Sequence, residues 1–433
     1  MTDRLPGGSH RCSRVPDVTG STLQRRLGLG DAVAIGLGSM IGAGVFAVFA
    51  PAAQAAGAGL LVGLAIAAVV AFANATSTAQ LAAAHPVAGG AWAYGRAELR
   101  PWAGFVAGWG FVIGKLASCA AMAMTFAAYA APAGFERPVA VAAVAALTIV
   151  NLLGVTRTAR LTRILVAIVL LCLSVVVAAG AVSLPDGLGS TGADVSPYGV
   201  LQSAGLIFFA FAGYARIATM GEEVRDPART IPRAILGAFA GALTVYAVLA
   251  VLCLLVLGPE RLAAASAPLA DLVSAAGWEW AQPVVRVGAA AASLGALLAL
   301  IAGIGRTSFA MSRGGDLPGF FAAVHPSRHT PYRAEIAVGA IVMVAVALVD
   351  LRGAIGFSSL GVLVYYLVAN LAALRQDAAR RRFPRALAAL GAAGCAVLAV
   401  TLPWQAALAG AGVLAVGVML RLVFGRRGAR RAA

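Results

Sequence analysis

The stretch GLGSMIGAGVF, residues 36–46, places four glycines inside an otherwise apolar segment of helical length. Glycine destabilises the interior of a helix, so four glycines in eleven residues predict a helix that is interrupted near its middle. A second apolar segment, FFAFAGYARIATMGEEVRDP at residues 208–227, has Gly213 and a polar turn near its middle. An interrupted helix leaves backbone amides and carbonyls without helical partners.

The rest of the chain has the composition of a membrane protein. Hydrophobic residues make up 61% of the 433 residues, and charged residues only 12%. Runs of about 20 apolar residues recur, which is long enough to cross a bilayer core of roughly 30 Å as helices. We therefore expect an all-α integral membrane protein. Its twelve transmembrane helices would lie near 30–50, 56–79, 102–130, 138–153, 161–184, 200–220, 233–257, 284–311, 332–351, 353–374, 384–401 and 403–424.

The basic excess follows the predicted topology. The net charge is +16, but with an N-terminus on the inner side 26 arginines fall on that side and four on the outer side. Arginine and lysine collect in cytoplasmic loops, so the excess indicates orientation in a lipid bilayer and not a nucleic-acid partner. We expect the protein in the bacterial inner (plasma) membrane, with both termini in the cytoplasm. The first 28 residues are expected to form a cytoplasmic tail and not a signal peptide.

Several other classes of site are excluded or left open. The five cysteines show no paired spacing, so neither a disulfide framework nor a metal site is implied, and no cofactor is expected. No metalloprotease pair, nucleophile elbow, mid-span carboxylate pair or phosphate-binding loop occurs, which argues against an enzyme or an ATP-driven pump. The spacing of Gly38 and Gly42 is also typical of close helix packing, and this alternative remains open for that pair taken alone.

Three separate blocks then match one family. GLGSMIGAGVF resembles the G-x-x-I-G-x-G-[IV]-F signature of the amino acid–polyamine–organocation (APC) transporter superfamily. Residues 208–235 and 304–336 resemble the family blocks around its sixth and eighth helices, in the right order. The resemblance covers nearly the whole chain and implies a bacterial amino acid permease. It implies the five-plus-five inverted-repeat fold of the leucine transporter, with helices 1 and 6 broken.

The resemblance divides the chain into a cytoplasmic tail, two repeats joined by an extracellular loop, two appended helices and a basic tail. These parts are 1–28, the repeats 29–184 and 200–374, the loop 185–199, the appended helices 375–424 and the tail 425–433.

The resemblance also assigns the substrate site. The unwound part of helix 1 would bind a carboxylate, and the break in helix 6 would meet an ammonium, with Phe209 covering the substrate as a gate. A helix N-terminus attracts anions and a C-terminus attracts cations, which agrees with this assignment. The residues carried over are Ser39, Met40, Ile41, Gly42, Ala43 and Gly44 in helix 1, and Ala210, Phe211, Ala212 and Gly213 in helix 6.

Two cations lie unusually deep in predicted spans. Lys115 is the only lysine of the chain and lies in the middle of the third span. Several bacterial relatives place a coupling lysine in helix 5, where this chain has Val169, so Lys115 is a candidate replacement or a source of cavity charge. Burial disfavours the charged form of a lysine, which makes such a group able to exchange protons. The alternative is a lysine that reaches to the interface along its stem.

Arg216, just past the break in helix 6, either faces the cavity or reaches to Glu222 or Glu223. Glu222, Glu223 and Arg225 are expected to form an inner latch, and Pro232 to open the next helix.

The charges favour one class of substrate. All seventeen acidic residues fall in loops, tails or the ends of predicted spans, so the cavity should be neutral to positive. A cationic substrate would lack a carboxylate partner there, and an unpaired desolvated charge is costly. The prediction is a secondary transporter that takes up a neutral amino acid with protons, by alternating access. The alternatives are an exchanger or exporter of the same fold, including one for cationic amino acids or polyamines.

Overall fold

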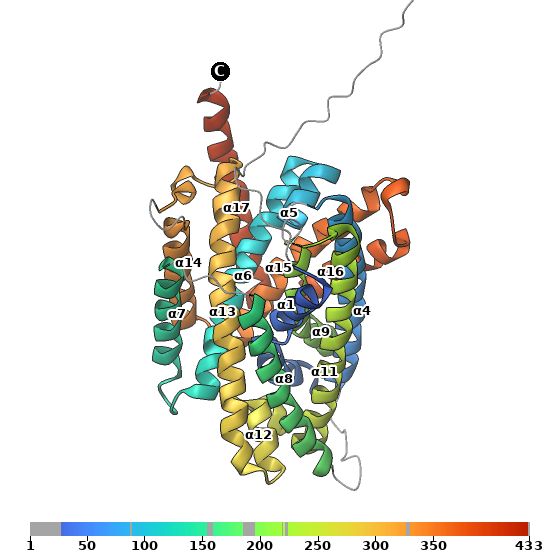
Figure 1. Ribbon diagram of the computed structural model, residues 1–433, viewed down its shortest axis with the longest axis vertical. Coiled ribbons are helices and arrows are strands. Elements are labelled where there is room, and N and C mark those ends of the chain that lie inside the picture. The colour runs from blue at the N-terminus through green and yellow to red at the C-terminus, as the bar shows by residue number, and fades with distance from the viewer. Residues whose placement is uncertain are drawn as a thin grey trace, which may run out of the picture.

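The computed structural model describes residues 27–86, 89–153, 159–184, 195–218, 220, 224–325 and 330–431. This part of the chain is built from helices that run mostly along the long axis of the molecule (Figure 1). The principal helices are α1 (Leu29–Met40), α2 (Ala43–Ala47), α3 (Phe49–Ala56), α4 (Leu60–Ala84), α5 (Ala91–Tyr94), α6 (Pro101–Ala130), α7 (Glu136–Leu152), α8 (Ala159–Val182), α9 (Pro197–Phe211), α10 (Ala215–Ala218), α11 (Pro227–Ala264), α12 (Pro268–Ala275), α13 (Gln282–Arg313), α14 (Tyr332–Leu348), α15 (Leu351–Arg375), α16 (Arg385–Thr401) and α17 (Trp404–Arg431).

Every predicted span overlaps one or more of these helices. Within the described part, nine helical segments are long and apolar enough to cross a membrane. The predicted spans at α7, α14 and α16 are helices of 17 residues each, at the short limit for a crossing. The chain is thus a multi-pass helical membrane protein, whereas the count of twelve spans and the inverted repeat stay predictions.

Glycines bring the central helices close together. A Cβ on Gly361 of α15 would lie 2.5 Å from the carbonyl oxygen of Gly110 on α6, so the two helices touch backbone to backbone. Further along the same two helices, the hydroxyls of Ser118 and Ser358 lie 2.7 Å apart. Small residues and interhelical hydrogen bonds are the usual means of packing helices in a bilayer, where burial of apolar surface gives no driving force.

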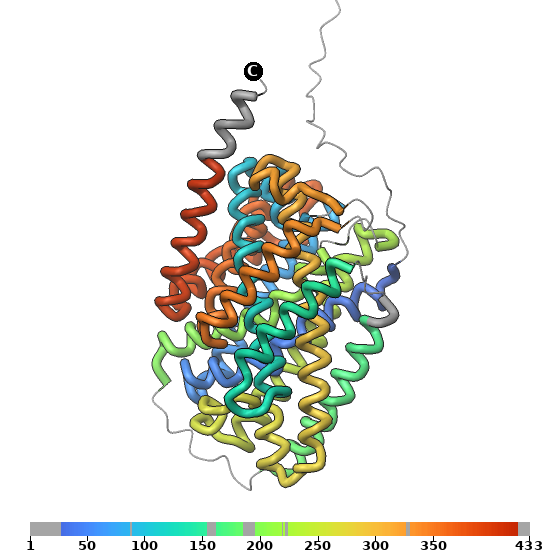
Figure 2. Tube along the Cα trace, turned by 90° about the vertical axis from the view of Figure 1, so that its left-hand side faces the viewer, coloured from blue at the N-terminus to red at the C-terminus, as the bar shows by residue number. Residues whose placement is uncertain are grey.

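Amides and a thiol join α4, α15 and α16. Asn370 Nδ2 donates to Asn74 Oδ1 over 2.6 Å, and Asn74 Nδ2 donates to the sulfur of Cys395 over 3.3 Å. All three side chains are buried. In contrast, α17 lies along one edge of the molecule (Figure 2).

The start of α11 corrects one expectation. Pro232 was expected to open this helix, but α11 begins at Pro227, which follows Asp226 in the left-handed conformation (φ 43°). Pro232 therefore lies within the helix and has no N–H to offer to the carbonyl of Ala228. That carbonyl instead accepts a hydrogen bond from Arg382 Nη1 over 2.8 Å. A long-range contact that the local sequence does not reveal thus lets the helix begin before its second proline.

Candidate functional site

The first break separates α1 from α2. Ile41 ends α1 by donating its N–H to the carbonyl of Leu37 over 2.7 Å. Gly42 then leaves the helical region, with φ −49° and ψ −132°, and α2 begins at Ala43. The first N–H groups of a helix have no partner within it, so this break carries free amides beside the free carbonyls of α1.

The second break follows α9. After Phe211 the chain makes one turn of 3₁₀-helix, η3 (Ala212–Tyr214), and then the single turn of α10. The α-helical ladder is thereby interrupted at Gly213, as the sequence predicted. The last carbonyls of α9, like those of α1, therefore lie at the C-terminal end of an interrupted helix.

The two breaks lie against each other. A Cβ on Gly213 would lie 2.3 Å from the carbonyl oxygen of Ser39 and 2.6 Å from the nitrogen of Met40. A Cβ on Gly44 would lie 2.9 Å from the Cα of Ala210. Both glycines are therefore required by a close approach of two backbones. Gly38 and Gly42, the pair for which packing was the alternative, lie against other helices: a Cβ there would lie 2.7 Å from Val166 Cγ2 and 3.1 Å from Ala296 Cβ, respectively.

Tyr246 of α11 connects the breaks. Its hydroxyl oxygen lies 2.6 Å from the carbonyl oxygen of Met40 and 3.0 Å from that of Ala210. The side chain is 1% exposed. One phenol proton thus serves a carbonyl near the end of each interrupted helix. No sequence pattern marks this residue, because a tyrosine in an apolar helix is ordinary.

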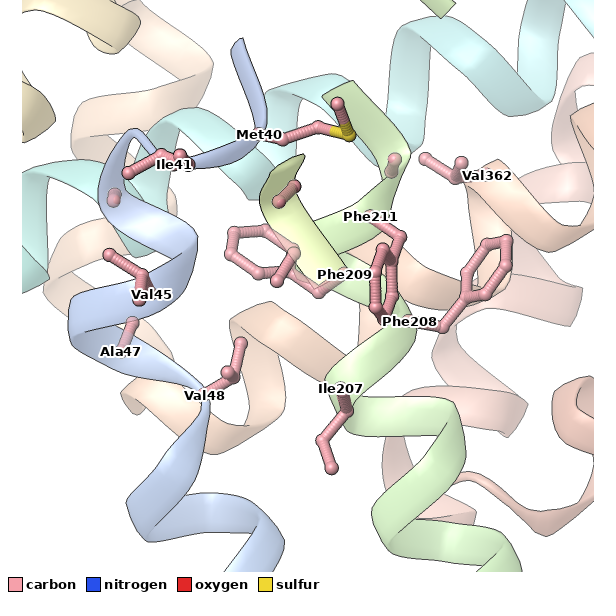
Figure 3. Close-up of a cluster of buried hydrophobic side chains, with 14 of the residues drawn as sticks. Met40, Ile41, Val45, Ala47, Val48, Ile207, Phe208, Phe209, Phe211 and Val362 are labelled. Carbon is pink, nitrogen blue, oxygen red and sulfur yellow. The ribbon is translucent and has the colours of Figure 1, made fainter. Parts of the chain in front are cut away.

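Aromatic rings surround this contact. The Phe211 ring lies 5.1 Å from that of Tyr246, and the Phe46 ring lies 5.6 Å from that of Tyr129. In Figure 3 the ring of Phe209 lies between α9 and α2, while that of Phe208 points to the side of Val362. Phe209 is 6% exposed, so the predicted gate residue is buried beside the breaks.

The structure therefore brings together the residues predicted to bind substrate. From Met40 to Gly44 and from Ala210 to Ala212 every residue is buried, whereas Ser39 and Gly213 are partly exposed. Ser39 turns its hydroxyl back to the carbonyl of Ile35 over 2.8 Å. In this conformation Ser39 thus faces the site with its backbone and not with its hydroxyl proton.

Lys115 is buried beside an aromatic ring of its own helix. It is 7% exposed, and its ammonium lies 6.0 Å from the centroid of the Phe111 ring, one turn nearer the start of α6. The Phe111 ring in turn lies 5.4 Å from the ring of Tyr365 on α15. Across the described residues no ion pair or hydrogen bond reaches Lys115. The lysine is thus enclosed without a neutralising acid, and its stem points towards the first half of α6.

The predicted inner latch is described only in part. Glu222 and Glu223 lie outside the described residues, and the side chains of Arg216 and Arg225 are exposed. The backbone of this segment nevertheless meets the start of α1. The N–H of Arg225 donates to the carbonyl of Leu27 over 2.9 Å, next to an isolated bridge between Leu27 and Val224.

A separate charge cluster was not predicted. Asp316, in the turn after α13, accepts from Trp92 Nε1 over 3.0 Å and pairs with Arg96 over 3.2 Å. Its second oxygen pairs with Arg421 of α17 over 3.0 Å. The guanidinium of Arg421 also lies 4.6 Å from the rings of Trp102 and Phe105. The acid and its partners are far apart in sequence, so no local pattern could have revealed the cluster.

The described residues contain no group of three or more histidine, cysteine or acidic side chains that could hold a metal ion. The four cysteines among them, Cys119, Cys172, Cys253 and Cys395, are free and buried. The polar groups at the breaks are backbone amides and carbonyls with the hydroxyls of Tyr246 and Tyr366, and such a set suits a small zwitterion.

Comparisons with known proteins give matches over almost the whole chain. Residues 27–424 match the family described as Amino acid permease. The chain is 57% identical over 398 residues to an uncharacterized transporter of Mycobacterium tuberculosis, covering 92% of this chain and 90% of that protein. It is 31% identical to the cationic amino acid transporter 7, chloroplastic, of Arabidopsis thaliana, over 84% of this chain and 68% of the plant protein. It is 25% identical to the branched-chain amino acid permease BcaP of Bacillus subtilis, over 98% and 99% of the two chains.

Proposed function

Because this chain belongs to the amino acid permease family, we propose that it is a secondary transporter that moves a neutral amino acid across the bacterial inner membrane. Transport would proceed by alternating access around the breaks of α1 and α9. The observation that carries the proposal is the direct contact of the two breaks, with Gly213 against Ser39 and the hydroxyl of Tyr246 on both helix-terminal carbonyls. Paired broken helices that meet in this way are typical of secondary transporters.

The two breaks offer complementary poles to a zwitterion. The amides from Gly42 to Gly44 open α2 and attract a carboxylate, because a helix begins with free N–H groups. The carbonyls of Met40 and Ala210 attract an ammonium. In the present conformation Tyr246 donates to those carbonyls, so a substrate ammonium would take over one of them from the phenol. Phe209 would then close over the substrate.

The charges of the interior support a neutral substrate. Three charged side chains are buried in the described part, Lys115, Asp316 and Glu335, and Asp316 is already paired with two arginines. A cationic side chain entering near the breaks would meet no buried carboxylate of the described residues there, whereas desolvation of its charge would remain. The name of the branched-chain relative agrees with a neutral substrate.

The second candidate is an exchanger or exporter of the same fold that takes cationic amino acids or polyamines. It is favoured by the plant relative named as a cationic amino acid transporter. Backbone carbonyls can hold a cation without an acid, which is the physical basis of this alternative.

The energy source is proposed to be the proton gradient, with Lys115 as the coupling or cavity-charge residue. The matched pair of variants is Lys115→Met, which removes the charge, and Lys115→Arg, which keeps a charge that does not titrate. Both keep a long side chain in the same enclosed position beside Phe111.

The test is uptake into proteoliposomes of labelled L-leucine, L-glutamate and L-arginine, with and without an inward proton gradient. We expect leucine to accumulate only with the gradient, and both variants to lose that dependence. Transport that ignores the gradient and requires amino acid inside the vesicle would establish the exchanger. Uptake of arginine that persists in Lys115→Met would contradict the substrate class.

A further inference from the structure

Glu335 is a buried acid that the substrate site does not use. It lies in the first turn of α14 and is 3% exposed. Asp316, the other buried acid of the described part, has three donors within 3.2 Å. Glu335, in contrast, has an oxygen, Oε2, that is enclosed and has no hydrogen-bond partner among the described residues. One of the two buried acids is therefore fully paired, and the other is not.

A glycine on α13 makes room for this side chain. A Cβ on Gly305 would lie 2.9 Å from Glu335 Cγ, so any larger residue there would push the carboxyl away. The next residue along α13, Arg306, is the cation whose charge acts on Glu335. The Arg306 side chain is exposed, and in the described part no ion pair joins it to Glu335.

The other groups around α14 do not supply a partner. The helix packs against α6, α7, α13 and η5 (Gly319–Ala322). The titratable group of α6 nearest mid-helix, Lys115, contacts Phe111. The inner half of α7 offers the amide of Asn151, bonded to Leu298, and the hydroxyl of Thr148, which donates to the carbonyl of Val144. Nearby ionisable side chains are otherwise engaged: Arg333 stacks on Phe320 and Tyr332, His325 packs on Tyr332, and Arg313 stacks on Phe309.

An ionised carboxylate with an unpaired, enclosed oxygen is costly, and such a group normally becomes neutral or acquires a partner. We propose that Glu335 is a proton-binding site, protonated in this conformation, that releases its proton when Arg306 swings into ion-pair distance. In that step the O–H bond of the acid breaks, the proton passes to water, and the carboxylate left behind pairs with the guanidinium. The part of this site in transport rests on the proposed function, but proton binding itself does not.

The first test needs no substrate. A carboxyl that is neutral in the folded chain and ionised in the unfolded chain makes folding take up a proton, so stability falls as pH rises. We expect the melting temperature of the detergent-solubilised protein to fall more steeply with rising pH in the wild type than in Glu335→Gln. Glu136→Gln, at an exposed position on α7, is the matched control and should follow the wild type. Parallel curves for wild type and Glu335→Gln would overturn the proposal.

Infrared spectroscopy tests independently whether Glu335 is protonated. The wild type at neutral pH should show the carbonyl stretch of a protonated carboxylic acid, and Glu335→Gln should lose it. Should Glu335→Gln fail to fold, Glu335→Asp keeps an acid in the site and should keep the band at a shifted position. Absence of the band from the wild type would overturn the proposal.

The transport test separates this site from the proposed function. In proteoliposomes carrying a pH dye, addition of L-leucine to the wild type should move protons, and Glu335→Gln should exchange leucine without moving them. Proton movement that is unchanged in Glu335→Gln would remove Glu335 from the transport cycle. If the wild type transports no labelled amino acid, the proposed function fails, whereas the stability and infrared results still decide whether Glu335 holds a proton.

Discussion

The hydroxyl oxygen of Tyr246 lies 2.6 Å from the carbonyl oxygen of Met40, the residue that ends α1. The same hydroxyl lies 3.0 Å from the carbonyl oxygen of Ala210 on α9. A single proton donor thus holds the ends of two interrupted helices beside a third helix. The conformation of both breaks therefore depends on one side chain from α11.

Removal of the Tyr246 hydroxyl should lower the stability of the fold without creating a cavity at the site. Tyr246→Phe keeps the ring packed on Phe211 but leaves two buried carbonyls without the phenol donor. The cost of an unsatisfied buried group is about 1–3 kcal/mol, and we expect a loss of stability of that size. Chemical or thermal unfolding in detergent measures it. The control is Tyr198→Phe, whose side chain is exposed and should tolerate the change.

The same variant should alter substrate binding in a defined direction. In the proposed site a substrate ammonium would compete with the Tyr246 hydroxyl for the carbonyl of Ala210, so the variant should lose less stability when leucine is bound than when it is absent. Equal losses with and without leucine would place the ammonium elsewhere.

Contact between the two breaks should make Gly213 intolerant of any side chain. In Gly213→Ala the new methyl would lie 2.3 Å from the carbonyl oxygen of Ser39, which is backbone and cannot rotate aside. We expect a destabilisation of about 1–3 kcal/mol, typical of overpacking, and loss of transport. The control is Gly303→Ala on α13, where a Cβ meets nothing within 4 Å. That variant should be neutral or slightly stabilising, because alanine favours a helix. Normal transport by Gly213→Ala would contradict the close contact.

The charge cluster at Asp316 should contribute strongly to stability. Asp316→Asn leaves Arg421, whose side chain is 14% exposed, without its anionic partner. Breaking a buried pair by removing one charge costs about 3–5 kcal/mol, and a large fall in melting temperature should follow. Asp226→Asn provides the control, because its pair with Arg229 spans 3.9 Å with both side chains more than half exposed. Exposed pairs are worth roughly 0–1 kcal/mol, so equal effects of the two substitutions would show that the Asp316 cluster is not buried in the membrane protein.

The sequence by itself determined the features that depend on neighbouring residues. Hydropathy marks the helices because each apolar run satisfies its own backbone hydrogen bonds, and all predicted spans overlap helices of the structure. The interruptions near Gly42 and Gly213 were predictable because glycine weakens a helix locally. The family, too, could be recognised from three contiguous blocks, and the match over residues 27–424 confirms it.

Only the tertiary structure decided which distant groups meet. Tyr246 reaches Met40 across 206 positions of sequence, and Glu335 lies against Gly305 of another helix. The sequence placed Glu335 at the end of a predicted span, where an acid is ordinarily solvated, and packing of α14 on α13 buried it instead. The helical period of a sequence shows which residues share one face of a helix. Which other helix that face contacts depends on how the helices pack. For this reason the two helix breaks were predictable from local sequence, whereas the positions of Tyr246, Asp316 and Glu335 were not.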